Sequence, residues 1–288
     1  MTTAVPPPIW TCQWMPLYQG IEQAMNLSPG APAAAPFSSP WSVPTINLLR
    51  VHMDDPQITT YSTPDSGLSG AGVTISQFLQ TAFNPQNQIG MVGINANFFD
   101  ITDSNSRNVL YGLAVSNLVT VPWQPRTDGH PYYPLLITQS NQATIGDANE
   151  ARTPDTWTAV SGNVLLLRDG QVAVPPPTSP GTPTPIFAAR TAVGVSYDPH
   201  YLYLATVDGL EANDLTKPYY GASYYDMALL LLRAGAIDAI NMDGGGSTTM
   251  GRIDSSGVTL MNVPYGNDAP PSSERPVGNC FAVIARAS

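Results

Sequence analysis

The spacing of apolar residues predicts two helices. In residues 74–83, apolar side chains recur every three or four positions, and Thr74 precedes them as a candidate N-cap. Residues 223–234 are apolar on most sides, with Ser223 as a candidate N-cap and Gly235 placed to end the helix. A helix without a polar face needs cover on all sides, so we expect the second helix to be buried.

Short apolar segments rich in β-branched residues predict strands over much of the remaining chain. Asp169-Gly170, a residue pair typical of a type I′ turn, predicts a hairpin over residues 163–174, and residues 190–207 have the pattern of a second hairpin. Further strands are predicted at Ile46–Met53, Ile89–Ile94, Tyr133–Thr138, Ala236–Met242 and Val277–Arg286. Helices and strands mix without strict βαβ alternation, which indicates an α+β fold with a mixed, mainly antiparallel sheet core and a few packed helices in a single domain.

Prolines divide the chain into an arm and a domain. The sequence has 29 prolines among 288 residues, against ~5% in an ordinary protein. Many of them lie in residues 1–45, which predicts an irregular N-terminal arm, and residues 46–288 then form the domain. Residues 175–185 are also Pro-rich and predict an extended surface loop.

The charge balance excludes several classes of partner. Lys and Arg total 11 and Asp and Glu total 21, so the formal net charge is −10. An acidic chain does not suit nucleic acid or an anionic membrane surface, and we expect neither partner. The longest apolar run, Met227–Leu232, is far shorter than the ~20 residues of a membrane span. The chain as given also begins without a basic segment followed by an apolar stretch, so we expect no signal peptide within it.

Two cysteines, Cys12 and Cys280, allow one intramolecular pairing. A disulfide would attach the arm to the last strand, as suits an exported protein. The alternative is that both are reduced, buried side chains. The sequence leaves both interpretations open.

Residues 243–249 (DGGGSTT) are the most informative segment, because they follow a predicted buried strand. Three glycines let the main chain approach a ligand closely, and their N–H groups can form a concave nest for an anion. Ser247 and Thr248 add hydroxyl groups, and Asp243 adds a carboxylate. The alternative is a tight turn, but three glycines lose much chain entropy on folding, which favours a ligand site.

Familiar catalytic motifs do not fit the chain. No lysine follows the glycines, as a P-loop requires, and Thr249 stands where a nucleophile elbow has glycine. His52, His130 and His200 lie far apart without metal-ligand spacing. Residues 103–108 (DSNSRN) resemble a calcium loop but lack the glycine at its sixth position, so we interpret them as a polar loop.

Polar and aromatic residues near one other strand end are candidates for substrate contact. Asn95 and Asn97 follow a predicted strand and can present amides to sugar hydroxyls. Phe98 or Phe99 would then form an apolar wall, whereas the alternative is an asparagine turn with core phenylalanines.

One arginine begins a predicted strand, and another lies just before one. Arg190 follows the second Pro-rich stretch, and Arg275 precedes the last strand. Because arginine is scarce in this chain, these positions suggest contact with an anion. The alternative is surface ion pairing with Asp208 and Glu274.

Taken together, several segments resemble the phosphodiester glycosidase family. They are Ile94–Phe99, Ser161–Gly170, Arg190–Gly194, Val207–Gly209, Gly221–Met250 and Arg275–Val277, in the order of the family. The run DAINMDGGGSTTM, residues 238–250, is the most specific of them. Ala96-Asn97 stands where the family often has two glycines, which implies a change in sugar specificity.

The resemblance implies a hydrolase that cleaves the sugar–phosphate glycosidic bond of a glycosyl phosphodiester, in a secreted, periplasmic or other extracellular setting. We expect the substrate to be a sugar phosphate or polysaccharide of a carbohydrate or cell-envelope polymer. Two alternatives stay open, namely a hydrolase of ordinary glycosides on the same fold and a non-catalytic carbohydrate-binding module. The motifs identify no certain cofactor and leave metal dependence open, since oxygen ligands near Asp100 or Asp243 could hold a divalent cation such as calcium. The oligomeric state is not indicated.

Such a reaction needs groups that hold phosphate and a carboxylate that supports an oxocarbenium-like centre. Asp243 is the preferred carboxylate, with Asp208 next. The predicted catalytic residues are Asp243, Arg190, Ser247 and Asp208. The predicted substrate-binding residues are Asn95, Asn97, Phe98, Phe99, Thr191, Gly244, Gly245, Gly246, Thr248 and Arg275.

Overall fold

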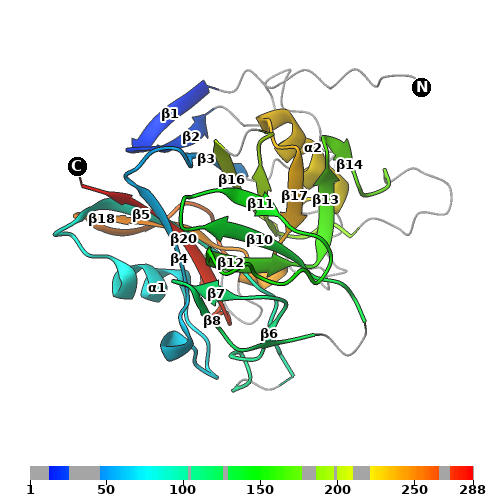
Figure 1. Ribbon diagram of the computed structural model, residues 1–288, viewed down its shortest axis with the longest axis horizontal. Coiled ribbons are helices and arrows are strands. Elements are labelled where there is room, and N and C mark those ends of the chain that lie inside the picture. The colour runs from blue at the N-terminus through cyan, green and yellow to red at the C-terminus, as the bar shows by residue number, and fades with distance from the viewer. Residues whose placement is uncertain are drawn as a thin grey trace.

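Three large β-sheets and two α-helices dominate the part of the chain that the structure describes (Figure 1). This computed structural model describes residues 13–25, 46–102, 105–125, 129–176, 186–197, 200–209, 221–265 and 273–287. The largest sheet has eight strands in the order β1 (Gln13–Tyr18), β2 (Ile21–Met25), β3 (Ile46–His52), β16 (Tyr201–Val207), β15 (Arg190–Val195), β17 (Asp238–Asn241), β13 (Val164–Arg168) and β14 (Gln171–Val172).

Two five-stranded sheets complete the framework. One has the order β11 (Ala143–Ile145), β10 (Tyr133–Thr138), β12 (Thr156–Gly162), β7 (Val115–Ser116) and β8 (Val119–Thr120). The other has the order β19 (Gly257–Leu260), β18 (Met250–Asp254), β5 (Gln88–Asn95), β20 (Cys280–Arg286) and β4 (Ile58–Ser62). All pairings in these sheets are antiparallel, and only the short pair β6 (Leu110–Tyr111) and β9 (Trp123–Gln124) is parallel among the described strands.

Both helices begin as the sequence predicts. α1 (Ile75–Ala82) and α2 (Tyr224–Ala234) each start with a capping box, in which Thr74 or Ser223 is the N-cap. α2 ends at Gly235, whose φ of +111° is the left-handed conformation that glycine adopts readily. Two short 3₁₀ helices, η1 (Asp65–Gly67) and η2 (Gly245–Ser247), lie in connections.

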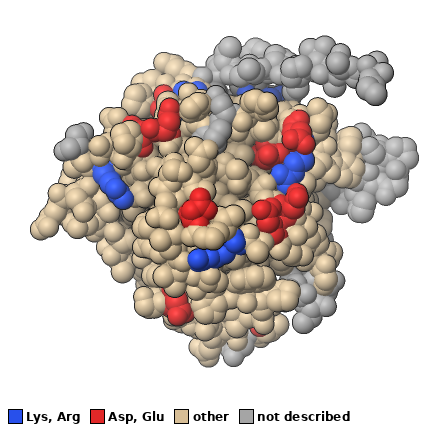
Figure 2. Space-filling view, viewed as in Figure 1, with Lys and Arg blue, Asp and Glu red and all other residues tan. Residues whose placement is uncertain are grey.

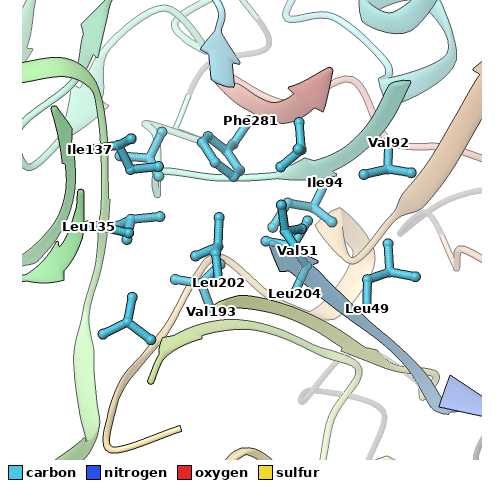
Figure 3. Close-up of a cluster of buried hydrophobic side chains, with 14 of the residues drawn as sticks. Leu49, Val51, Val92, Ile94, Leu135, Ile137, Val193, Leu202, Leu204 and Phe281 are labelled. Atoms are coloured by element: carbon cyan, nitrogen blue, oxygen red, sulfur yellow. The ribbon is translucent and has the colours of Figure 1, made fainter. Parts of the chain in front are cut away.

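A central core lies between the sheets, and its residues come from strands of all three (Figure 3). Alternation along each strand sends neighbouring side chains to opposite faces. In β16, Leu202 and Leu204 enter this core, whereas Tyr203 and Ala205 pack on the other face with α2. α1 covers the outer face of the sheet that contains β5 and β20.

The predicted elements are confirmed at each position given above, and the two predicted hairpins form β13–β14 and β15–β16. At the first hairpin turn, Asp169 and Gly170 have φ of +52° and +71°, as a type I′ turn requires. The sheets are mainly antiparallel, as expected, and strands predominate over helices. Most of the second Pro-rich stretch lies outside the described residues, as does Cys12, so the disulfide stays a prediction.

The predicted arm contains a regular hairpin that sequence patterning missed. Within residues 1–45, β1 and β2 pair antiparallel, and β2 pairs with β3 of the eight-stranded sheet. Trp14 lies 4.5 Å from the Arg50 guanidinium and packs beside Tyr203. Residues 13–25 therefore belong to the sheet framework instead of forming an irregular segment.

Charged side chains are sparse on the face shown in Figure 2, where single charged residues and small groups of blue and red residues are separated by wide uncharged areas. This agrees with a charged content of 11% in the sequence. Among the described residues, neither helix is long and apolar enough to cross a membrane.

Candidate active site

The candidate site forms where β17 ends in the interior of the eight-stranded sheet. β17 lies between β15 and β13, and the chain then bends through Gly245, whose φ is +60°. The Gly245 N–H donates to the Ala189 carbonyl at 2.8 Å, and the Gly244 N–H donates to the Asp243 carboxylate at 2.9 Å. Because these two amides already have acceptors, the expected anion nest of three glycine amides does not form. We call residues 243–249 the glycine bend.

Asp243 is held by its backbone and is partly exposed. Its N–H donates to the Ala96 carbonyl at 3.1 Å, and its carbonyl accepts from Asn95 Nδ2 at 2.7 Å. The carboxylate therefore sits on a fixed main chain at the end of a central strand. A fixed, partly exposed carboxylate is suited to act on a bound substrate.

Asn95 acts as a clamp beneath the glycine bend. Besides holding Asp243, its Oδ1 accepts from Thr191 Oγ1 at 2.7 Å and from the Thr249 N–H at 3.1 Å. Asn95 and Thr191 are fully buried. Their side chains thus join β5, β15 and the bend, and in this structure neither is accessible to a sugar.

Asn97 is also buried and bonded to protein. Its Nδ2 donates to the carbonyls of the three consecutive residues Tyr111, Gly112 and Leu113 at 3.0 to 3.2 Å. Its Oδ1 accepts from the Ser161 N–H and from Asn279. The predicted role of Asn97 in orienting sugar hydroxyls does not fit this geometry, which instead fixes the loop after β6.

Arg190 begins β15 and lies next to the glycine bend. Its Nη1 would lie 3.8 Å from a Cβ placed at Gly244. The side chain is 6% exposed, donates to the Ala222 and Ile186 carbonyls, and lies 4.2 Å from the ring centroid of Tyr224. Burial lowers the pKa of the Arg190 guanidinium, whereas Tyr224 and the negative charge of Asp226 raise it.

Arg275 reaches the same bend from the segment before β20. Its Nη1 lies 3.4 Å from Ser247 Oγ. Arg275 is partly exposed, whereas Ser247 is fully buried. The two predicted guanidinium groups therefore do converge on the glycine bend.

Asp208 supports the bend through Asn262. The Asp208 carboxylate is 5% exposed and accepts from Asn262 Nδ2 at 3.0 Å and from the Val263 N–H. Asn262 Nδ2 also donates to the Thr248 carbonyl, and its Oδ1 accepts from the Met250 N–H. This geometry favours a positioning role for Asp208 over the catalytic role expected from the sequence.

The two phenylalanines separate into different environments. Phe99 is 6% exposed and belongs to the hydrophobic core beneath α1, which agrees with the alternative of a core residue. Phe98 is partly exposed, and its ring lies 6.2 Å from that of Tyr132. Of the pair, Phe98 is the one placed to contact a ligand.

Exposure thus divides the predicted site into two groups. Asp243, Gly244, Gly245, Phe98 and Arg275 are partly exposed and can meet a substrate. The buried group comprises Asn95, Asn97, Phe99, Arg190, Thr191, Asp208, Gly246, Ser247 and Thr248. Within the described part of the chain, the buried Thr248 and Thr249 hydroxyls have no hydrogen-bond partner.

The structure adds three residues that the sequence did not assign to the site. Tyr224 covers the Arg190 guanidinium, Asp226 places a negative charge near it, and Asn262 joins Asp208 to the bend. Asp226 lies in the first turn of α2, a position that indicates a helix start and not a site. No local sequence pattern marks Tyr224 or Asn262 as site residues, because their partners are distant in sequence.

A cavity elsewhere in the described structure contains none of the predicted site residues. A cavity of ≈ 380 Å³ is lined by residues that include Asp54, Asp55, Trp157 and Arg286. It lies at the opposite ends of β5, β12 and β20 from the glycine bend. Among the described residues, no group of three or more His, Cys, Asp or Glu side chains could hold a metal ion, and calcium stays a prediction.

The chain matches one protein family and several solved structures. The family model for phosphodiester glycosidases matches residues 90–284. No curated protein matches the chain in sequence. Among solved structures, the catalytic domain of zebrafish N-acetylglucosamine-1-phosphodiester alpha-N-acetylglucosaminidase, auto-inhibited by its pro-peptide, has a TM-score of 0.60 at 19% identity, over 86% of this chain and 78% of that chain.

Two further solved structures share the fold. A hypothetical protein from Synechocystis has a TM-score of 0.56 at 14% identity, over 97% of this chain and 64% of that chain. A protein of Burkholderia pseudomallei K96243, named as a candidate exported protein, has a TM-score of 0.54 at 13% identity, over 84% of this chain and 74% of that chain.

Proposed function

The chain belongs to the phosphodiester glycosidase family and is a hydrolase of glycosyl phosphodiesters, and we propose that it acts on a sugar–phosphate linkage of a carbohydrate or cell-envelope polymer. The observation that carries our site assignment is the arrangement at the glycine bend. The carboxylate of Asp243, which is partly exposed, stands on the bend. The guanidinium groups of Arg190 and Arg275 approach the bend, at Gly244 and Ser247, from two other segments of the chain.

The chemistry of the leaving group explains why this arrangement suits the reaction. Water adds its oxygen to the anomeric carbon and gives up one proton to a base, the bond from that carbon to the phosphate oxygen breaks, and the electron pair of that bond leaves with the phosphate. The departing phosphate monoester has a second pKa of about 6, so it needs little protonation at neutral pH. The protein must instead stabilise growing negative charge on phosphate and positive charge at the anomeric carbon.

The residues divide these tasks by their exposure. Asp243 is the group that faces the anomeric centre as nucleophile, base or charge stabiliser. Arg275, next to Ser247 Oγ, binds the phosphate, and buried Arg190 adds positive charge behind the bend. Asp208 and Asn95 hold the bend in place through their hydrogen bonds.

The test of this assignment is Asp243→Asn, assayed on a glycosyl phosphodiester and on the aryl glycoside of the same sugar. We expect kcat on the phosphodiester to fall by a factor of about 100 or more, because the variant keeps the shape but loses the charge. Asp147→Asn is the control, since Asp147 is 92% exposed and remote in the fold.

Three outcomes would contradict the proposal. Wild-type turnover by a folded Asp243→Asn variant removes Asp243 from the mechanism. A preference of the wild type for the aryl glycoside makes the protein an ordinary glycosidase. Retention of ligand without product makes it a binding module.

The proposal includes an exported location. It is supported by the name of the Burkholderia pseudomallei neighbour, and it fits a substrate in the cell envelope. Fractionation of cells that express the full gene product measures this directly, and recovery of the protein only in the cytoplasm would contradict it.

A further inference from the structure

The polar loop between β5 and β6 brings a third arginine to the segment that carries Arg275. Arg107 lies in this loop, and its N–H donates to the Gly70 carbonyl at 3.0 Å. The Val109 N–H donates to the Ser106 carbonyl, and this hydrogen bond closes a backbone turn that contains Arg107. The side chain leaves this loop and extends along the segment that carries Arg275.

Two contacts fix the Arg107 side chain in that direction. Its Nη1 donates to the carbonyl of Pro276, the residue directly after Arg275. Its Cδ passes close to Gly72, where a Cβ would lie only 2.8 Å away. Gly72 has φ of +74° and no side chain, and so leaves room for the arginine stem.

Arg107 and Arg275 are thus neighbours of like charge. Burial lowers the pKa of Arg107, and the positive charge of Arg275 lowers it further. Two adjacent guanidinium groups repel each other, and an anion between them removes the repulsion while accepting hydrogen bonds from both.

From this geometry we infer that Arg107 and Arg275 form a two-guanidinium subsite for the phosphate group of the substrate, beside Ser247 of the glycine bend. The inference rests on the proposed function and names the group that distinguishes a glycosyl phosphodiester from an ordinary glycoside. Arg107 would touch the non-bridging phosphate oxygens directly.

The positive charge of the subsite matches the negative charge of the departing monoester better than that of the phosphodiester substrate. A phosphodiester carries one negative charge, whereas the departing monoester approaches two at neutral pH, because its second pKa is about 6. Two guanidinium groups therefore stabilise the transition state and the product more than the ground state, which raises kcat. The same match predicts inhibition by inorganic phosphate.

The experiment compares Arg107→Gln with Arg152→Gln. Arg152 is a matched control, because its Nη1 also donates to a backbone carbonyl, that of Leu118, on another part of the molecule. For Arg107→Gln we expect kcat on the phosphodiester to fall by a factor of about 10 or more. Turnover of the aryl glycoside of the same sugar should fall by a much smaller factor, because that substrate has no phosphate, and inhibition by inorganic phosphate should weaken by about the same factor as phosphodiester turnover.

A second variant keeps the inference testable where Arg107→Gln does not fold. Arg107→Lys retains the charge and a donor for the Pro276 carbonyl but loses the planar fork, so we expect a smaller loss of phosphate inhibition. Phosphate inhibition and phosphodiester turnover equal to those of Arg152→Gln, in a folded Arg107→Gln or Arg107→Lys variant, would overturn the inference.

Failure of the proposed function gives a different result. A wild type that cleaves no glycosyl phosphodiester contradicts that function, and titration with inorganic phosphate by calorimetry then tests the subsite alone. Binding to the wild type that weakens in Arg107→Gln supports the subsite. Binding that is absent, or equal in both proteins, contradicts it.

Discussion

Buried asparagine side chains at the candidate site determine which residues a substrate can reach. Asn97 is 1% exposed; its two amide hydrogens are shared among three neighbouring carbonyls, and its Oδ1 accepts from the Ser161 N–H. A buried backbone group that loses its partner retains the full cost of having left water. Asn97 is therefore a structural residue that shapes the site from below.

This role predicts a stability effect for Asn97→Ala. We expect the free energy of unfolding to fall by about 3 kcal/mol, because several buried carbonyls lose their donor. Urea unfolding measures the change, and Gln80→Ala, an exposed change on α1, is the control. A folded Asn97→Ala variant of normal stability with a raised KM would show instead that Asn97 contacts the sugar.

Residue types at the site could be predicted from the sequence, but their exposure could not. Asp243, Arg190 and Arg275 were identified by their positions at strand ends, and the structure brings them together. Burial depends on segments that are distant in the chain. Asn95, for example, is covered because Thr191 and Thr249 meet it from two other elements.

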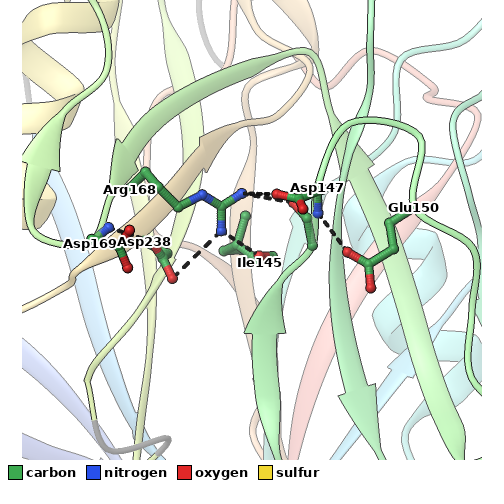
Figure 4. A network of polar contacts seen from close by, with 7 residues as sticks. Ile145, Asp147, Glu150, Arg168, Asp169 and Asp238 are labelled. Carbon is green, nitrogen blue, oxygen red and sulfur yellow. Dashed lines mark hydrogen bonds and ion pairs between the residues drawn. The ribbon is translucent and has the colours of Figure 1, made fainter.

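Elements are joined across sheets by a network around Arg168 at the end of β13 (Figure 4). Arg168 donates to the Ile145 carbonyl at 2.7 Å and to the Gly146 carbonyl at 3.0 Å, and so ties β13 to the end of β11. Its ion-pair contacts with Asp238 and Asp147 are longer, at 3.7 and 3.5 Å. The carbonyl bonds, more than the ion pairs, should therefore hold the two sheets together.

The prediction at this scale separates the two kinds of contact. We expect Arg168→Met to lower the free energy of unfolding by about 2 kcal/mol, because two carbonyls lose their charged donor. Asp147→Asn should change it by less than about 0.5 kcal/mol, because an ion pair with an exposed carboxylate contributes little. Thermal unfolding of both variants gives the comparison. Equal losses would show that the ion pair carries the connection.

Local chemistry explains which elements were predictable. Capping residues at Thr74 and Ser223 and the turn pair Asp169-Gly170 act over three or four residues, and they gave the helices and a hairpin. β12 was missed because its two threonines and its alanine are buried only through pairing with β7 and β10. Such pairings join distant segments and leave no local pattern.

At the scale of the whole molecule, the three sheets share one core. Side chains from β2, β5, β10, β16 and β20 all enter it, so each sheet covers apolar surface of the others. The site lies at one end of these strands and inherits its rigidity from them. The N-terminal hairpin of β1 and β2 is part of this framework and therefore helps to position the glycine bend.

The N-terminal hairpin offers the test of that view. Ile21 of β2 is fully buried in the shared core, whereas Met15 of β1 is 44% exposed. We expect Ile21→Ala to lower the free energy of unfolding by about 3 kcal/mol, since it leaves a cavity, and Met15→Ala to change it by less than about 0.5 kcal/mol. Because the core is shared, Ile21→Ala should lower the melting temperature of the whole protein in one transition, followed by calorimetry. A separate early transition, with the main one unmoved, would show that residues 13–25 unfold independently of the shared core.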